Sequence, residues 1–502
     1  MFNFNEKIEA FSIEQEKIEG KGFHYKGKKF VPHTSLHWKN TALVRFSLLQ
    51  FVVLIILVTA YIYTITTNWH TTLIVTVSAL TIFYFIDLLF NLFLMIRSFT
   101  VNPEIKIANK HIAALHAYQL PIYVVLCPLY KEWEILPQFV KAIQALDYPK
   151  DRLKAVLLLE EDDKETIERA NKQNLPEYFS ILVVPHSFPK TKPKALNYAL
   201  GKVKGDVAVI YDAEDVPDPQ QLKKVLIAFH TLPRDIVCIQ AKLNFYNPNQ
   251  NILTRLFSVE YSLWFDLILP GLQSINAPIP LGGTSNHFRI SDLQKLNGWD
   301  PFNVTEDADL GMRLFKNGYK TAILDSTTLE EANSDLMNWF QQRSRWIKGY
   351  MQTYLVHMRG MDSYFLNPLN PHILTFQIII GGKVLSMFVN PFMWILTLVY
   401  FAFRGQSGAF IESLFPSFIF YLGIICLFAG NFLYIYFYMM GALKRRQWSL
   451  ILVSFLAPVY WLMISISAII ALIDLIQRPH MWRKTKHGLH LDQNAIPKGA
   501  IT

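Results

Sequence analysis

The sequence predicts a Rossmann-like α/β domain with a mostly parallel sheet, inserted between transmembrane helices. Three observations support this prediction. The 502 residues are 52% hydrophobic and only 17% charged, which is too apolar for a set of ordinary soluble domains. The apolar excess gathers in long runs near both ends of the chain. Between them, from about residue 118 to residue 335, apolar segments of strand length alternate with helical patterns.

Five apolar runs are long enough to cross a hydrocarbon core of about 30 Å as helices. Two of them lie early, at residues 43–65 and 73–96, and only a short polar turn around Asn68 separates them. They therefore predict a helical hairpin. Three more runs follow late in the chain, at about residues 372–403, 410–440 and 450–476.

Lysine and arginine flank the early hairpin on its outer sides and are missing from its turn. By the positive-inside rule, the N-terminus and the α/β domain should lie in the cytoplasm, with the protein in the plasma (inner) membrane. The first forty residues are polar and of mixed charge, so we expect no signal peptide. The net charge of +9 is assigned mostly to residues beside the membrane, because no nucleic-acid-binding motif is present.

The late runs conflict with a simple topology. By the positive-inside rule, Lys444–Arg446 and Arg478 should all lie in the cytoplasm. A single crossing of the membrane by residues 450–476 would instead place the two groups on opposite sides. One late run should therefore be irregular, and the number of crossings stays open between about five and six. The candidates are the stretch from Gly381 to Pro391, as an interfacial or re-entrant helix, and the last run, which is interrupted at Pro458.

Short apolar runs give the order of elements in the α/β domain. Continuous apolar runs predict buried parallel strands at residues 122–127, 155–159, 181–184 and 207–211. The patterns between them predict crossover helices at residues 135–146, 164–172 and 194–200. In a doubly wound sheet of this kind, ligands bind at the carboxyl ends of the strands.

Acidic residues follow two of these strands. Asp212 and Glu214 come after the fourth strand. Carboxylates two apart on a loop can both face a hard cation such as Mg²⁺ or Mn²⁺, or they can simply flank the next helix. After the second strand, Glu160 and Asp162 belong to an acidic group that either accepts hydrogen bonds from a nucleotide base or forms a solvated helix N-terminus.

Two further helix starts carry candidate residues. Lys192 and Lys194 open a helix whose free amides also favour an anion, so each is either a diphosphate ligand or a surface lysine. Thr305-Glu306-Asp307 opens another helix, with Thr305 as the expected N-cap. Asp307 then stands where a general base can reach a hydroxyl, although acids at a helix N-terminus also occur without any ligand.

Residues 336–350 form an aromatic, basic and amphipathic pattern just before the late runs, which predicts a helix in the headgroup plane. Gln342, Arg345 and Trp346 fall within little more than one helical turn. They are therefore candidates to cluster over the mouth of the domain, where arginine suits a diphosphate and tryptophan suits the apolar face of a sugar ring.

The order of these motifs resembles the membrane-integrated family 2 glycosyltransferases, which include cellulose, chitin, hyaluronan, mannan and curdlan synthases. The resemblance rests on the acidic loop after the fourth strand, Gly282-Gly283-Thr284, Thr305-Glu306-Asp307 and the Gln-x-x-Arg-Trp motif. It implies a GT-A fold for the cytoplasmic domain. Trp482 to Gly488 looks like the C-terminal motif of a bacterial subgroup, which implies a gating loop that must be cytoplasmic.

The resemblance also implies roles for individual residues. Asp307 matches the catalytic base. Asp212 and Glu214 match the metal-binding pair, although Glu214 stands where the commoner pattern has aspartate. The residues expected to contact the donor are Glu160 (with Glu161 as an alternative), Asp162, Lys194, Gln342, Arg345 and Trp346.

The implied function is an inverting transfer of a sugar from a UDP-sugar, with UDP-glucose as the first candidate, to a growing β-linked polysaccharide that leaves across the membrane. Aromatic residues of the late runs would then either stack on the glycan or only pack and anchor the helices: Trp394, Tyr400, Tyr460 and Trp461. Two alternatives stay open, a non-processive glycosyltransferase that forms a glycolipid and a catalytically silent membrane partner of polysaccharide export. The expected partners are the donor, a glycan or glycolipid acceptor, the lipid bilayer and accessory export subunits, with no nucleic acid.

These elements predict six regions along the chain. They are a cytoplasmic segment (1–40), two transmembrane helices (41–97), the glycosyltransferase domain (98–335), interfacial helices (336–383), C-terminal transmembrane helices (384–477) and a cytoplasmic tail with the gating motif (478–502).

Overall fold

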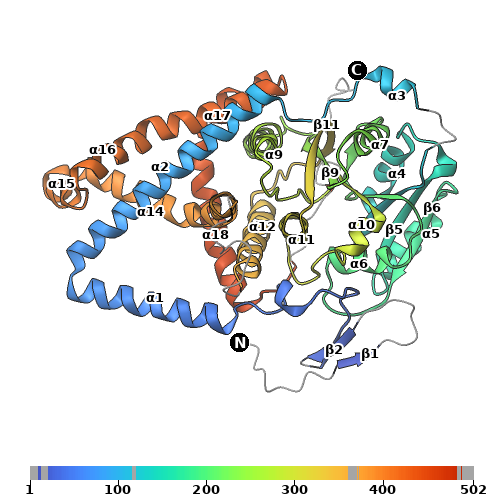
Figure 1. Cartoon of the computed structure of the whole chain (residues 1–502), viewed down its shortest axis with the longest axis horizontal. Coiled ribbons are helices and arrows are strands. Elements are labelled where there is room, and N and C mark those ends of the chain that lie inside the picture. Colours follow the sequence, from blue (N-terminus) through green and yellow to red (C-terminus); the bar gives the residue numbers. More distant parts are fainter. Residues whose placement is uncertain are drawn as a thin grey trace.

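The structure is a computed structural model that describes residues 10–12, 21–25, 27–115, 120–359, 370, 372–482 and 488. Figure 1 shows an α/β domain on one side and long apolar helices on the other, with α12 (Leu336–His357) and α18 (Ala457–Gln477) between them. Near the start of the chain, a small antiparallel sheet consists of β1 (Ala10–Ser12), β2 (Lys21–Tyr25) and β3 (Lys28–Phe30).

The α/β domain is built on a mixed sheet of eight strands in the order β6-β5-β4-β7-β10-β9-β11-β8. The predicted strands form its parallel half: β4 (Tyr123–Leu129), β5 (Leu153–Glu160), β6 (Phe179–Val184) and β7 (Val207–Ile210). The sequence did not predict the other four: β8 (Val216–Pro217), β9 (Ile236–Phe245), β10 (Asn286–Arg289) and β11 (Lys320–Glu330). β10 runs antiparallel to β7 and β9, whereas β9 and β11 are parallel.

Both faces of the parallel half are covered, which is why its strands read as continuous apolar runs. Along β4, Tyr123, Val125 and Cys127 pack into one core, while Val124 and Leu126 pack into the other. The helices of the domain include α3 (Asn109–Ala113), α4 (Leu136–Gln144), α5 (Lys164–Lys172), α6 (Lys192–Leu200), α7 (Gln221–Thr231), α8 (Ile252–Leu263), α9 (Leu269–Ser274), α10 (Ile290–Lys295) and α11 (Glu306–Lys316).

Within the described residues, five helical segments are long and apolar enough to cross a membrane. They are α1 (Leu48–Thr67), α2 (Trp69–Val101), the run from α13 (Ile373–Phe376) to α14 (Lys383–Ala402), the run from α16 (Ser417–Ile425) to α17 (Asn431–Lys444), and residues 448–477, which end in α18. The stretch near Gly381 is a π-helical turn, Gln377–Gly382, that continues directly into α14. The short helix α15 (Arg404–Ser413) lies at the end of the bundle farthest from the sheet (Figure 1).

Buried ion pairs fix the end of α17 to the α/β domain. Lys444 Nζ lies 2.7 Å from Glu104 Oε1, and Arg445 pairs with Asp266. Lys242 of β9 pairs with the same two acids. Because buried charges are stable only when they are paired, this cluster holds the basic end of α17 beside the sheet.

The last apolar run begins and ends against the α/β domain. It starts just after Arg445, and residues 448–456 are short 3₁₀ turns that precede Pro458 in the first turn of α18. At the other end, Lys348 and Gln352 of α12 donate hydrogen bonds to the carbonyls of Met481 (2.7 Å) and Pro479 (3.0 Å). In Figure 1, α18 lies beside α12, between the domain and the other apolar helices.

These contacts suggest how the conflict between the basic residues can be resolved. Lys444 and Arg445 pair with acids of the α/β domain, and the Arg478 carbonyl accepts a hydrogen bond from Lys348 of α12. We therefore expect both basic groups on one side of the membrane, the last run to be the irregular one, and α18 to lie along the membrane face instead of crossing it.

Cysteine labelling tests this topology. In a background that lacks Cys426, the partly buried native thiol, Arg446→Cys and Arg478→Cys should both react with a membrane-impermeant maleimide from the side of the α/β domain. Gln406→Cys, on α15, is the matched control and should react only after the vesicles are permeabilised. A variant of Arg478 that reacts only from the opposite side would contradict the placement of α18.

Candidate active site

A single cavity of about 900 Å³ begins at the carboxyl ends of β4, β5 and β7 and extends into the apolar helices. Among the described residues, Glu160 and Glu260 line its domain end in ion pairs with Lys194 and Arg343. Six further carboxyl groups line the same end: Glu132, Asp212, Glu214, Glu306, Asp307 and Glu330. They come from the loops after β4 and β7, the first turn of α11 and the end of β11. The topology therefore brings Asp212, Glu214 and Asp307 to one place.

Crowding and burial keep these acids from ionising as easily as free carboxyl groups. Burial, and then the charge of Asp212, raises the pKa of Glu214 well above its ordinary value. Burial raises the pKa of Glu306 to about 8, with the Asp307 charge adding to the shift. Asp307 itself has its pKa raised by burial to about 6, because backbone hydrogen bonds and Lys192 partly offset the desolvation. Such perturbed carboxyl groups in a cleft are typical of an active site.

Two cations of the described cavity lining face this acidic group, Lys192 and Arg345. Lys192 bonds a carboxylate oxygen of Asp212 and, at 2.7 Å, the carbonyl of Gly283. Although burial lowers the pKa of Lys192, the charges of Asp212 and Glu306 raise it above its ordinary value. Lys192 is therefore firmly charged at the point where the two acidic loops meet.

Lys194 takes a different position from Lys192. Its side chain is fully buried, and its Nζ lies 2.7 Å from Glu160 Oε2. Among the described residues, Glu160 and Lys192 line the cavity while Lys194 stands behind Glu160. Lys194, which was expected to contact the diphosphate, therefore pairs with Glu160 and does not line the cavity among the described residues. The difference is one of helical phase, because residues two apart on α6 face different directions.

Asp162 lies at the edge of the cavity. It pairs with Lys190 and lies 3.9 Å from His186 Nδ1, while the Tyr130 hydroxyl is 3.5 Å from its Oδ2. Glu160, Lys190 and Tyr130 line the cavity at this corner. Sequence reasoning missed Tyr130, although it follows directly after β4, where ligands of parallel sheets are expected.

α12 contributes Gln342, Arg345 and Trp346 to the cavity lining, so the three side chains share one face as their spacing predicts. Arg343 also lines the cavity, but its charge is paired: it bonds Glu260 and donates a 2.8 Å hydrogen bond to the Tyr460 hydroxyl. The helix is not surrounded by solvent: it packs between α11 and α18.

The first turn of α11 lies directly against α12. Thr305 takes the N-cap position, as predicted, although its hydroxyl makes no capping hydrogen bond. A Cβ added at Gly349 would lie only 2.2 Å from Thr305 Oγ1. The glycine thus allows the helix that carries Asp307 to approach the helix that carries Arg345.

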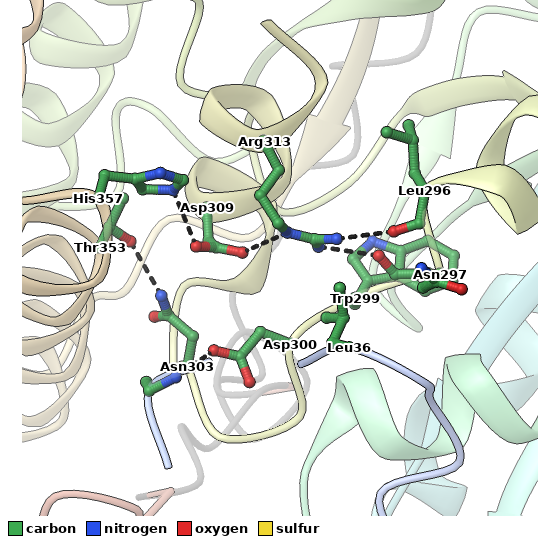
Figure 2. Close-up of polar contacts among 12 residues, drawn as sticks. Leu36, Leu296, Asn297, Trp299, Asp300, Asn303, Asp309, Arg313, Thr353 and His357 are labelled. Atoms are coloured by element: carbon green, nitrogen blue, oxygen red, sulfur yellow. Dashed lines mark hydrogen bonds and ion pairs between the residues drawn. The ribbon is translucent and has the colours of Figure 1, made fainter. Parts of the chain in front are cut away.

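Figure 2 shows the polar contacts that hold α11 in this position. Asp309 Oδ2 accepts a 2.9 Å hydrogen bond from Arg313 Nε, and its Oδ1 lies 3.1 Å from His357 Nε2 of α12. Asn303 donates a 2.9 Å hydrogen bond to the Thr353 hydroxyl. Although burial raises the pKa of Asp309, Arg313 and His357 hold it below its ordinary value. Sequence reasoning missed this group, whose only signal is the i, i+4 spacing of Asp309 and Arg313.

The end of the described chain also reaches the cavity. Trp482 lines it, and the Arg345 guanidinium lies 5.3 Å from the centroid of the Trp482 ring. Beyond it, the Gly488 amide donates a 2.6 Å hydrogen bond to Glu331. The predicted C-terminal motif therefore begins and ends on the domain, while its residues 483–487 lie outside the described part of the chain.

The acidic loops suit a divalent cation. In the described part of the chain, no three His, Cys, Asp or Glu side chains converge as a preformed metal centre. Asp212 and Glu214 nevertheless offer hard oxygen donors, and Asp212 already accepts the ammonium group of Lys192. Because negative charge on Asp212 raises the pKa of Glu214, added positive charge would relieve that repulsion. The residues present thus fit Mg²⁺ or Mn²⁺.

Comparison with known proteins shows the family of the chain. Residues 207–473, more than half of the chain, match the family described as glycosyl transferase family group 2. The probable glycosyltransferase YdaM of Bacillus subtilis (strain 168) is 27% identical over 234 residues, which cover 46% of this chain and 56% of YdaM. The chain therefore spans little more than half the length of this curated relative.

A solved structure shows the same fold. The mannosyltransferase PcManGT from Pyrobaculum calidifontis, in complex with GDP-Man and Mn²⁺, matches with a TM-score of 0.50 and 17% identity, over 81% of this chain and 99% of that one. This likeness confirms the predicted fold class, a GT-A-like α/β domain with a mostly parallel sheet, flanked by apolar helices.

Removal of Asp309 tests the contact between α11 and α12. Asp309→Ala leaves Arg313 buried without its carboxylate partner, so we expect it to cost about 3–5 kcal/mol of stability, measured as a lower midpoint of thermal unfolding in detergent. Asp151→Ala is the control, because the Asp151 side chain is 79% exposed beside Arg152 and exposed pairs contribute little. Equal midpoints for the two variants would contradict a supporting role for Asp309.

Proposed function

Because the chain belongs to glycosyl transferase family group 2, we propose that it is a membrane-bound inverting glycosyltransferase. It transfers a sugar from a UDP-sugar, with UDP-glucose as the first candidate, to a growing β-linked polysaccharide, and the product leaves through the helix bundle. The observation that supports this proposal is the single cavity, which joins the acidic site of the α/β domain to the interior of the apolar helices. A soluble transferase has no need of such a continuation.

Asp307 is the proposed catalytic base. A base with a pKa near 6 is ionised at neutral pH and still strong enough to accept a proton. It takes the proton from an acceptor hydroxyl, whose oxygen attacks the anomeric carbon of the donor as the bond to the diphosphate breaks. Inversion follows from this single displacement.

The departing nucleoside diphosphate gains negative charge, which Arg345 and Lys192 are placed to stabilise. Gln342 and Trp346 share the cavity face with Arg345 and are proposed to hold the acceptor end. Asp212 and Glu214 would hold Mg²⁺ or Mn²⁺, which supplies further positive charge to the diphosphate when bound.

The nucleoside end of the donor is assigned to the corner formed by Tyr130, Glu160 and Lys190. Glu160 can accept hydrogen bonds from a base edge, and the ring of Tyr130 offers a stacking surface. Lys194 supports this corner by holding Glu160 in place.

A donor panel tests the proposal. Detergent-purified protein is offered UDP-glucose, other UDP-sugars and GDP-mannose with Mg²⁺ or Mn²⁺; GDP-mannose is included because the structural neighbour holds GDP-Man and Mn²⁺. Release of UDP together with a polymer sized on a gel supports the proposal. A single glycolipid product would favour a non-processive transferase, and no nucleotide release from any donor would indicate a silent export partner.

The base assignment predicts both a variant and a pH dependence. Since protonation of Asp307 removes the base, kcat/KM should fall as the pH decreases through about 6. This pH is higher than the one at which an ordinary aspartate would be protonated.

Asp307→Asn should lower kcat by about 10²–10⁴-fold while UDP binding in the presence of the metal is retained. Asp235→Asn is the control, because Asp235 directly precedes β9, at the end of the strands opposite to the cavity. This variant should keep the pH profile of the parent protein. A fully active Asp307→Asn would refute the assignment.

A further inference from the structure

The cavity contains a second polar centre inside the helix bundle. Asp87 and Asn91 of α2, Lys383 of α14 and Tyr434 of α17 all line it. We propose that these four residues, here called the collar, form a sugar-binding subsite that takes an uncharged glycan chain. This inference rests on the proposed function and specifies the class of its product.

The collar residues lie where the apolar helices meet the rest of the protein. On α2, Leu94, three residues after Asn91, lies against Gly271 of α9. On α17, Tyr434 packs against the cluster of Met95, Leu267 and Phe437, in which Leu267 belongs to the α/β domain. Gly381, two residues before Lys383, lies against Tyr354 of α12. The collar therefore stands at the entrance from the acidic site into the helix bundle.

The collar residues bond one another across the helices. Asn91 Nδ2 donates to Asp87 Oδ1 at 3.1 Å and lies 3.2 Å from the Tyr434 hydroxyl. That hydroxyl also donates to Asp87 Oδ2. Lys383 Nζ is 3.3 Å from Asn91 Oδ1 and 4.0 Å from Asp87 Oδ1. Donors and acceptors of this kind match the hydroxyl groups of a sugar.

The lining continues beyond the collar along one face of α14. Lys383, Asn390, Trp394, Thr397 and Tyr400 follow one another at helical spacing, and all line the cavity. From the first to the last, this face extends about 26 Å. The Tyr84 hydroxyl bonds Asn390 from α2. Polar and aromatic groups thus lie among apolar lining residues such as Met387 and Leu396, and a glycan offers hydroxyl edges to the first and apolar ring faces to the second.

An ion pair between two apolar helices, lining the cavity, argues for a polar occupant. Ionisable side chains inside a bilayer are expensive and occur where they face a water-filled cavity or each other. A lipid tail in the same place would leave Asp87 and Lys383 against hydrocarbon. The collar therefore favours a hydroxyl-rich chain over an acyl or prenyl chain.

The charges along the path indicate an uncharged chain. Among the described cavity residues on the apolar helices, Asp87 and Glu412 carry negative charge and Lys383 and Arg404 carry positive charge. The two signs balance, and each acid lies near a base or a hydroxyl: Glu412 accepts a 2.7 Å hydrogen bond from Tyr400. A polyanionic glycan would need an excess of basic residues, which this lining does not offer.

Binding of oligosaccharides tests the collar without any transfer step. The probes are a β-linked glucose hexasaccharide and a hexasaccharide of the same length that contains uronic acids, both titrated by tryptophan fluorescence against the purified full chain. We expect the neutral probe to bind, and the charged probe to bind on the order of tenfold more weakly or worse. Asp87→Leu should weaken binding of the neutral probe on the order of tenfold.

Tyr434→Phe is the conservative variant, because it removes only one hydroxyl from the collar. We expect it to weaken binding of the neutral probe several-fold and to leave the midpoint of thermal unfolding unchanged. Thr76→Val on α2, the helix that carries Asp87, is the matched control, because the Thr76 hydroxyl bonds the Thr72 carbonyl of its own helix. Equal affinity of parent, Asp87→Leu and Tyr434→Phe for the neutral probe would overturn the subsite. So would stronger binding of the uronic acid probe, or of a polyprenyl phosphate. Absence of sugar transfer would instead refute the proposed function, and the binding titration would still decide on the collar.

Discussion

The packing of α11 against α12 is the contact on which the rest of the molecule depends. α11 carries Asp307, and α12 carries Arg345. Their separation is fixed by the close approach at Gly349 and by the ion pairs around Asp309. Because α18 packs along the other side of α12, the same contact also sets where the last apolar run and Trp482 lie relative to the sheet. A rigid contact at this point lets an active site and a membrane bundle share one cavity.

Charge is distributed in two different ways across the protein. At the junction of α17 with the sheet, Lys242, Lys444 and Arg445 meet Glu104, Asp266 and Asp325, so that buried charge is compensated within the chain. At the domain end of the cavity, acids outnumber the two facing cations, and several carboxyl groups have raised pKa values. The first arrangement stabilises a fixed contact. In the second arrangement the negative charge exceeds the positive charge, which favours binding of a further cation.

Much of this arrangement could be predicted from the sequence, and the failures have physical causes. The parallel strands were visible because both of their faces are buried, whereas β9 was missed because it buries Gln240, Lys242 and Asn244 among its apolar residues. Spacing correctly brought Gln342, Arg345 and Trp346 to one face. It could not separate Lys192 from Lys194, because helical phase depends on where α6 packs. Hydropathy likewise could not indicate where the last run ends, since that depends on contacts of its two ends with the α/β domain and α12.

The collar has a further consequence for the membrane. A passage wide enough for a sugar chain is also wide enough for water, and a continuous water column across a membrane conducts protons and dissipates the gradient that the cell maintains. Asp87, Asn91, Lys383 and Tyr434 bond one another across three helices. Under the proposal, the side chains that bind the glycan would also close the path to water and ions, and the same hydrogen bonds that a sugar replaces would preserve the insulating property of the bilayer.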